Sequence, residues 1–167
     1  MDSITIRPFD PNEWPLFKEF RLQALEAAPG VFATSYEEAA ARSPQEWQAT
    51  INGHDHEVFG LFDGESLIGI TAVFTSRDDP SGQTAILAMS FILPEYRGRG
   101  LSRLFYEVRI EWIRRQPQFK RVIVSHRASN EASRRANQHY GFVATGRKPH
   151  VWPDGETEDE ITYELVI

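Results

Sequence analysis

Two glycines set between arginines, Gly98 and Gly100, mark the segment of this chain best suited to chemistry. The stretch Ser90–Arg103 runs from an apolar strand through these glycines into a predicted helix. Glycine adopts positive φ at low cost and lets a ligand approach the main chain, and the helix that follows begins with unpaired N–H groups. Arg97 and Arg99 add positive charge suited to phosphate oxygens. The segment therefore predicts a phosphate-binding turn.

Two better-known phosphate motifs do not fit this turn. A P-loop ends in Gly-Lys-Ser/Thr, whereas Leu101 and Ser102 follow Gly100. A dinucleotide-binding turn requires a third glycine, and Arg103 occupies that position. An ordinary strand–helix turn also uses glycines, so a second signal is needed before a ligand is assigned.

The second signal lies further along the chain. Asn130 opens a predicted helix that contains Ser133 and runs into Tyr140-Gly141-Phe142. This pattern, taken with the earlier one, resembles the GNAT superfamily of acyl-CoA-dependent N-acyltransferases over roughly Val58 to Ile167. The residues that carry the first half of the resemblance are Ile92, Pro94, Arg97, Gly98, Gly100 and Leu101. Ser102 departs from the family pattern, which has Gly or Ala there, and its hydroxyl either donates to a phosphate or caps the helix.

The resemblance implies an α/β (α+β) fold of the GNAT type. Its sheet is mixed but mostly antiparallel, with about six or seven strands flanked by helices, and one parallel strand pair splays apart. The pantetheine arm of acetyl-CoA enters that gap, and its pyrophosphate lies on the glycine turn. The implied cofactor-binding residues are Phe91, Ile92, Leu93, Arg97, Gly98, Arg99, Gly100, Leu101, Ser102, Arg103, Asn130 and Ser133.

The implied reaction is direct attack of an amine on the acetyl thioester, which needs a neutral amine and a proton for the departing thiol. Tyr140 occupies the family's acid position. A phenol with a pKa of about 10 can donate a proton to a thiolate whose conjugate acid has a pKa of about 8.5. The alternative interpretation of Tyr140 is core packing against Phe142 at a helix end.

The base is less well defined. An α-amine with a pKa of about 8 needs little help at neutral pH, whereas a lysine amine at about 10.4 is almost wholly protonated. Glu38, His126 and His150 are candidates, and His126 follows the predicted strand Arg121–Ser125, where active sites of open α/β sheets gather. A surface role for His126 and a water relay from several groups are the alternatives.

The predicted function is acetyl transfer to a small-molecule amine. A protein N-terminal or lysine acetyltransferase and a catalytically silent acetyl-CoA-binding module are the alternatives. We expect the acceptor to be selected by Leu16–Ser43 and by the loop His150–Glu158, where Trp152 and Asp154 can contact an amine. A long open groove beside Tyr140 would favour a peptide, and a closed, acidic, aromatic pocket a metabolite.

Composition restricts the other classes of function. A chain of 167 residues with 41% hydrophobic content predicts a single domain over residues 1–167. A net charge of −6 argues against nucleic acid or an anionic membrane as a partner. The absence of cysteine excludes disulfides, thiolate metal sites and cysteine nucleophiles. Nothing distinguishes a monomer from a homodimer.

Metal binding and membrane insertion are not expected. His54, Asp55 and His56 have no further ligand at a recognisable spacing, so a polar loop is the preferred interpretation. No segment approaches the ~20 apolar residues of a membrane span, and the N-terminus lacks the apolar core of a secretory signal. The cytoplasm is the expected location.

The predicted elements alternate between helix and strand. Ser43 and Glu46 form a capping-box pattern at a helix start. A helix that connects two neighbouring strands of one sheet makes those strands parallel, so Thr84–Leu93 should pair with Arg121–Ser125 in parallel. Helices are expected at Pro11–Ala27, after Ser43, from Leu101 to Trp112 and at Asn130–His139, and strands at Ile4–Ile6, Val58–Phe62, Ser66–Thr75, Thr84–Leu93, Arg121–Ser125, Phe142–Thr145 and Glu160–Val166.

Overall fold

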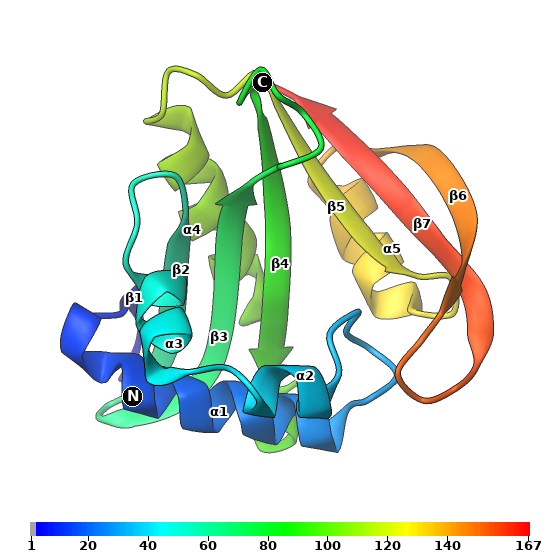
Figure 1. The fold of residues 1–167 in the computed structure, drawn as a ribbon. Coiled ribbons are helices and arrows are strands. Elements are labelled where there is room, and N and C mark those ends of the chain that lie inside the picture. Colours follow the sequence, from blue (N-terminus) through cyan, green and yellow to red (C-terminus); the bar gives the residue numbers. More distant parts are fainter. Residues whose placement is uncertain (1–2) are drawn as a thin grey trace.

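The computed structural model describes residues 3–167, and its strands form one seven-stranded sheet in the order β1-β2-β3-β4-β5-β7-β6 (Figure 1). The strands are β1 (Ile4–Pro8), β2 (Glu57–Asp63), β3 (Ser66–Thr75), β4 (Thr84–Ile92), β5 (Arg121–Arg127), β6 (Val143–Val151) and β7 (Thr157–Val166). The helices are α1 (Trp14–Ala27), α2 (Tyr36–Ala40), α3 (Pro44–Ile51), α4 (Ser102–Arg114) and α5 (Glu131–His139), with short 3-10 turns at Pro11–Glu13 and Pro94–Tyr96.

Strands β4 and β5 are the one parallel pair in this sheet, and they separate along their length. They pair only where Thr84–Ile86 lies beside Arg121–Ile123, and beyond that point they diverge (Figure 1). Met89 has a φ of 60°, and the register of β4 against β3 shifts beside it. A residue that departs from extended geometry bends its strand away from its neighbour. The predicted parallel pair that splays apart is therefore confirmed.

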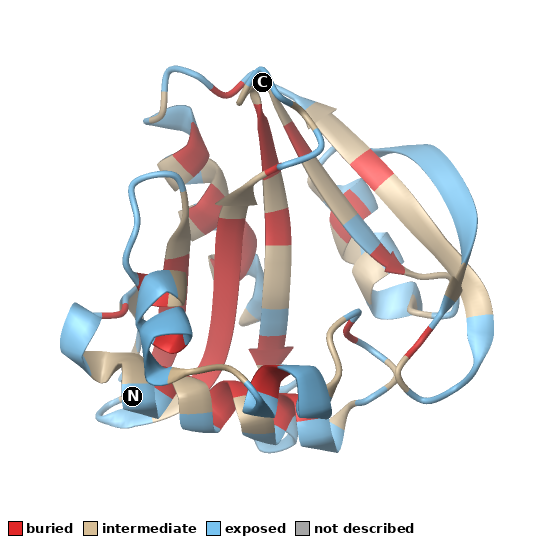
Figure 2. Ribbon diagram, in the orientation of Figure 1, coloured by how far each residue is buried: buried red, intermediate tan, exposed pale blue. Residues whose placement is uncertain are grey.

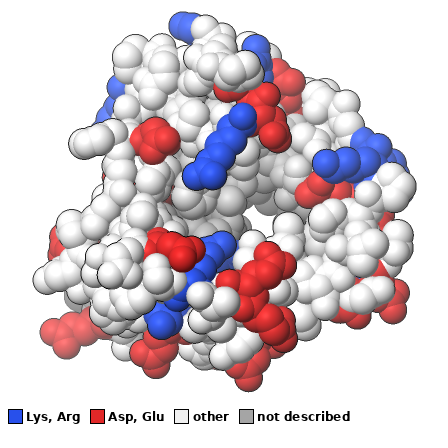
Figure 3. All heavy atoms as spheres, in the orientation of Figure 1, with Lys and Arg blue, Asp and Glu red and all other residues white. Residues whose placement is uncertain are grey.

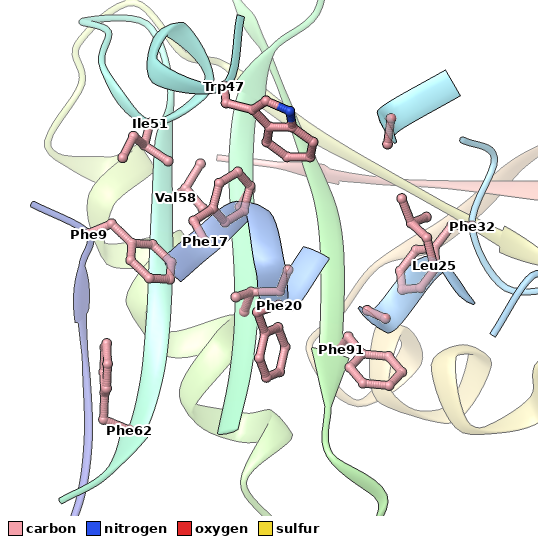
Figure 4. Close-up of a cluster of buried hydrophobic side chains, with 14 residues drawn as sticks. Phe9, Phe17, Phe20, Leu25, Phe32, Trp47, Ile51, Val58, Phe62 and Phe91 are labelled. Atoms are coloured by element: carbon pink, nitrogen blue, oxygen red, sulfur yellow. The ribbon is translucent and has the colours of Figure 1, made fainter. Parts of the chain in front are cut away.

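Aromatic side chains hold the N-terminal helices against one face of the sheet. Phe17 of α1 packs edge-on against Trp47 of α3, with ring centroids 5.8 Å apart, and both side chains are fully buried (Figure 4). The ring centroid of Phe32, in the loop after α1, lies 6.2 Å from that of Phe91 of β4. Burying large aromatic surfaces dominates core energetics. The packing brings the α1–α2 loop to the gap between β4 and β5.

Helices α4 and α5 cover the opposite face (Figure 1). The buried side chains of α4 are Phe105, Tyr106, Arg109 and Ile113, and Val108 and Trp112 are partly buried against the same core. Figure 2 shows β3 buried along most of its length. Arg109, which is 3% exposed, lies on the buried face of α4 in place of an apolar residue.

The last hairpin is longer than the sequence pattern indicates. The strand predicted at Phe142–Thr145 extends to Val151, and the strand predicted at Glu160–Val166 begins at Thr157. The expected loop His150–Glu158 is therefore shortened to residues 152–156. Nearly every residue of β6 is exposed (Figure 2), so it carries no inside–outside alternation to detect. Cross-strand pairing and the ion pair between Arg147 and Asp159 hold this edge strand. Helix α2, which was not predicted, is a single short turn capped by Ser35.

Every helix within residues 3–167 is too short or too polar to span a lipid bilayer.

Candidate active site

A cleft opens between β4 and β5 and consists of two adjoining cavities of about 630 and 250 Å³. The larger, the outer cavity, is bordered by the α1–α2 loop, the end of β4, the start of α4 and the loop between β6 and β7. The smaller, the inner cavity, lies between Leu87–Ser90 and Val124–His126 and is closed by α4 and α5. Figure 3 shows this face hollowed, with charged side chains at the rim of the hollow. Both cavities share Ser90, Ser102 and Asn130.

The glycine turn lies at the mouth of the cleft. Gly98 and Gly100 have φ values of 79° and 73°, a left-handed conformation that glycine adopts far more readily than other residues. No protein atom lies within 4 Å of where a Cβ would stand at either position. Leu101 precedes α4 and gives its first turn no side-chain cap. The main chain of this turn is therefore open to an anionic ligand at a helix N-terminus.

The three arginines of the turn differ in position. Arg97 lines the outer cavity, where its Nε donates to the carbonyl of Ile92 at 2.9 Å. Arg99 is exposed and donates to the carbonyl of Glu95 at 3.1 Å. Arg103 is exposed, and its Nη1 lies 3.7 Å from Oε2 of Glu107. Among these, Arg97 is the one placed to contact a ligand inside the cleft.

The predicted cofactor-binding residues divide into two groups. Phe91, Ile92, Arg97, Ser102 and Asn130 line the outer cavity, and Ser133 lines the inner cavity with Ser102 and Asn130. The side chain of Asn130 caps α5 by accepting from the Ser133 amide at 3.1 Å. The remaining predicted residues line neither cavity; they are Leu93, Gly98, Arg99, Gly100, Leu101 and Arg103.

Tyr140 lies just outside the cleft. Its ring stacks on Tyr106 with centroids 4.4 Å apart and planes 7° apart, and it lines neither cavity. Burial raises the pKa of Tyr140; the charge of Glu107 adds to the increase and that of Arg103 opposes it. The phenol is therefore protonated at neutral pH, but the structure does not bring it into contact with either cavity. Its role as an acid stays a prediction.

His126 lies inside the cleft and is buried in the wall of the inner cavity. Its Nδ1 is 2.6 Å from the carbonyl oxygen of Arg127, and its Nε2 is 3.2 Å from the hydroxyl of Tyr163. Both ring nitrogens therefore have partners, and a base role for His126 stays a prediction. The other two candidates, Glu38 and His150, line neither cavity.

Arg127, which the sequence did not single out, ties the two sides of the outer cavity together. Its guanidinium donates to the carbonyl of Gly30 at 2.9 Å, to Asp154 at 2.6 Å and to Glu158 at 2.7 Å. These hydrogen bonds lower the pKa of Asp154 and of Glu158, and backbone or hydroxyl donors nearby lower them further. The α1–α2 loop and the β6–β7 loop, which lie side by side in Figure 1, are thus joined by one half-buried cation. We refer to this contact as the Arg127 bridge.

Three further residues of the inner cavity were missed: Tyr106, Arg109 and Asn137. A signal existed for Arg109, because it stands one helical turn from both Phe105 and Ile113 on the buried face of α4. Asn137 carries no such signal in a helix whose other residues are polar or small.

Two of the three residues considered above as metal ligands, Asp55 and His56, contact each other. His56 Nδ1 is 2.8 Å from Asp55, its Nε2 is 3.1 Å from the carbonyl of Ala49, and its ring stacks on Phe74. These contacts occupy both ring nitrogens of His56.

Comparison with known proteins agrees with this geometry. Residues 3–143 match the family model described as "Acetyltransferase (GNAT) domain". A GNAT-family acetyltransferase from Streptococcus pneumoniae superposes with a TM-score of 0.85 at 18% identity, covering 98% of this chain and 99% of that one. The acetyltransferase of Salmonella typhimurium that modifies the N-terminal serine of ribosomal protein L7/L12 superposes with a TM-score of 0.74 at 17% identity. The match covers 99% of this chain and 95% of that one. The yncA protein of Salmonella typhimurium, solved with its cofactor acetyl-CoA, superposes with a TM-score of 0.75 at 19% identity. The match covers 99% of this chain and 94% of that one. A search of curated proteins finds no match.

Proposed function

We propose that this chain, which belongs to the GNAT acetyltransferase family, transfers the acetyl group of acetyl-CoA to the primary amine of a small molecule, with residues 1–167 acting as one domain. The observation that carries the proposal is the pairing of β4 and β5, which stops after Ile86 and leaves a cleft whose mouth is the glycine turn. A ligand with a diphosphate at one end and a narrow amide-containing arm at the other fits these two features.

The residues present suit acetyl-CoA. The open turn at Gly98 and Gly100 and the uncapped start of α4 would hold the diphosphate, and Arg97 would contact it from inside the cleft. Beyond Ile86, β4 has no partner strand on the side facing β5, so its main-chain groups there would pair with the amides of the pantetheine arm. The acetyl thioester supplies the group to be transferred.

The Arg127 bridge supports a small acceptor. It joins the two loops that border the outer cavity, and a Cβ at Gly30 would stand 2.6 Å from Asp154 Oδ2, so the loops pack without a space between them. A long peptide needs an open groove across this border. A compact amine needs only the part of the outer cavity that lies beside these two loops.

The transfer requires that the amine be neutral and that the departing sulfur be stabilised. His126 is the proposed base, inside the cleft. Tyr140 is the proton donor that the family pattern proposes, and it lies outside both cavities. The leaving sulfur therefore needs a partner inside the cleft.

The proposal is tested by mass spectrometry of two pools incubated with acetyl-CoA and the protein. One pool contains small primary amines and the other contains peptides with free N-termini and lysines. We expect acetylated products in the small-amine pool, and less product with the Gly98→Val variant when acetyl-CoA is kept below saturation. Products in the peptide pool alone would assign protein acetylation, and acetyl-CoA binding without product in either pool would make the chain a silent binding module.

A further inference from the structure

The inner cavity contains a buried cation and no carboxylate among the described residues that line it. Arg109 of α4 is 3% exposed, and its one hydrogen bond to protein runs from Nε to the carbonyl of Phe105 at 2.9 Å. Burial lowers its pKa to about 10, which leaves it charged at neutral pH. An ionised side chain without a counterion in a protein interior is costly. The guanidinium is therefore placed for an anion that the protein itself does not supply.

Asn137 of α5 presents a second unpartnered donor to the same cavity. Its side chain is 1% exposed, and its Oδ1 accepts from the hydroxyl of Tyr106 at 2.6 Å. Its Nδ2 is buried and has no hydrogen-bond partner. Because Tyr106 occupies the oxygen of the amide, the free group that Asn137 offers to an occupant is an N–H donor. Tyr106 also lies beneath the guanidinium of Arg109, which is 5.2 Å from its ring centroid.

Helix α4 connects this end of the cleft to the glycine turn. Ser102 begins the helix and lines both cavities, and Arg109 stands seven residues later, roughly 10 Å along the axis. A ligand whose diphosphate lies at the turn and whose arm follows β4 thus reaches the inner cavity with its far end. In acetyl-CoA that end is the thioester.

We infer that the inner cavity is a thiolate-binding site, in which Arg109 and Asn137 stabilise the sulfur of coenzyme A as it leaves and Tyr106 positions Asn137. The inference rests on the proposed function. In the step, the nitrogen lone pair of the amine forms the C–N bond to the acetyl carbon, the C–S bond breaks, and its electron pair moves to sulfur. The extra proton on nitrogen passes to His126 or to water. The thiolate is held by the Nδ2–H of Asn137 and the charge of Arg109, and solvent protonates it on release.

The titratable and charged groups that face this site are Tyr106 and Arg109 from α4 and His126 from β5. The lining residues from β4, from α5 and from the α1–α2 loop carry no ionisable side chain. No negative charge therefore opposes a thiolate there, and the thiol of bound coenzyme A should be more acidic than that of free coenzyme A.

The test measures the thiol of bound coenzyme A directly. Ultraviolet difference absorbance is recorded against pH for the protein with coenzyme A, relative to the protein with desulfo-coenzyme A, which lacks the thiol. The chain contains no cysteine, so the thiolate signal belongs to the ligand alone. We expect its midpoint at least one pH unit below that of free coenzyme A, which is about a tenfold change in the ratio of thiolate to thiol.

Variants of Arg109, Asn137 and Tyr106 show which side chains lower the titration midpoint of the bound thiol. Asn137→Ala and Arg109→Met should move the midpoint back toward that of free coenzyme A, whereas Arg109→Lys, which keeps the cation, should retain most of the shift. Tyr106→Phe keeps the ring and should move the midpoint partway. Thermal melting and calorimetric titration with coenzyme A show that each variant folds and binds. Tight binding by the wild type with the midpoint of free coenzyme A would overturn the inference alone, and failure to bind coenzyme A would overturn the proposed function.

Discussion

Gly98→Val isolates the contribution of the open turn, because nothing in the protein surrounds the new side chain. No heavy atom lies within 4 Å of a Cβ at this position, so the substitution causes no clash. Its cost is conformational, since a φ of 79° is unfavourable for a β-branched residue, and amounts to about 1–3 kcal/mol of stability. If the main chain here binds the diphosphate, the valine also blocks that approach. Losing one hydrogen bond to a charged group costs about 1.5–3 kcal/mol, which predicts ~10- to 100-fold weaker binding of acetyl-CoA.

Gly82→Val is the matched control for this change. Gly82 has a φ of 72°, has no atom within 4 Å of a Cβ, and lies between β3 and β4 away from both cavities. The Gly82→Val variant should lose about as much stability as Gly98→Val in thermal melting. In calorimetric titration it should bind acetyl-CoA like the wild type. Equal affinities for the two valine variants would refute the assignment of the glycine turn as the diphosphate site.

The other predictions concern the arginines and Tyr140. Arg97→Ala should weaken acetyl-CoA binding in calorimetric titration by about 1–3 kcal/mol, because Arg97 lines the outer cavity. Tyr140→Phe should leave kcat within about threefold if groups inside the inner cavity stabilise the leaving sulfur, because the phenol lines neither cavity. A loss of roughly 10- to 10³-fold would instead support Tyr140 as the acid. Asp154 and Glu158 have folded-state pKa values below 3.8 and 4.5, so the Arg127 bridge stabilises the fold above pH ~4.5 and is lost as the pH falls through those lower values. The melting temperature should therefore drop more steeply below pH ~4.5 in the wild type than in Arg127→Gln, and parallel curves would contradict this.

The parts of the fold that the sequence predicted are those set by local pattern and chain connection. Two glycines before an amphipathic run mark a turn and a helix start whatever the rest of the chain does. A helical connection between two neighbouring strands fixes their parallel direction, so β4 and β5 followed from their order alone. The exposed strand β6 lacked such a signal, because its pairing with β7, and not burial, determines its length.

The site residues that escaped prediction depend on contacts between distant segments. Arg127 joins Gly30 to Asp154, which are 97 and 27 residues away from it in the chain. Asn137 becomes significant only because Tyr106, 31 residues earlier, occupies its oxygen. No spacing rule within one element encodes either contact. Arg109 is the exception, since an arginine on the buried face of a helix conflicts with the pattern around it and can be noticed from sequence.

The distribution of charge within the cleft, and not the net charge of −6, is the electrostatic feature that suits the proposed ligand, acetyl-CoA. Arg97 stands at the mouth and Arg109 at the closed end, while the one carboxylate that lines either cavity among the described residues, Asp154, is paired with Arg127. Acetyl-CoA carries permanent negative charge at its phosphates and acquires it at sulfur only as the acetyl group leaves. A guanidinium at the closed end therefore interacts more strongly with the transition state than with the bound thioester, which is the condition for accelerating the transfer.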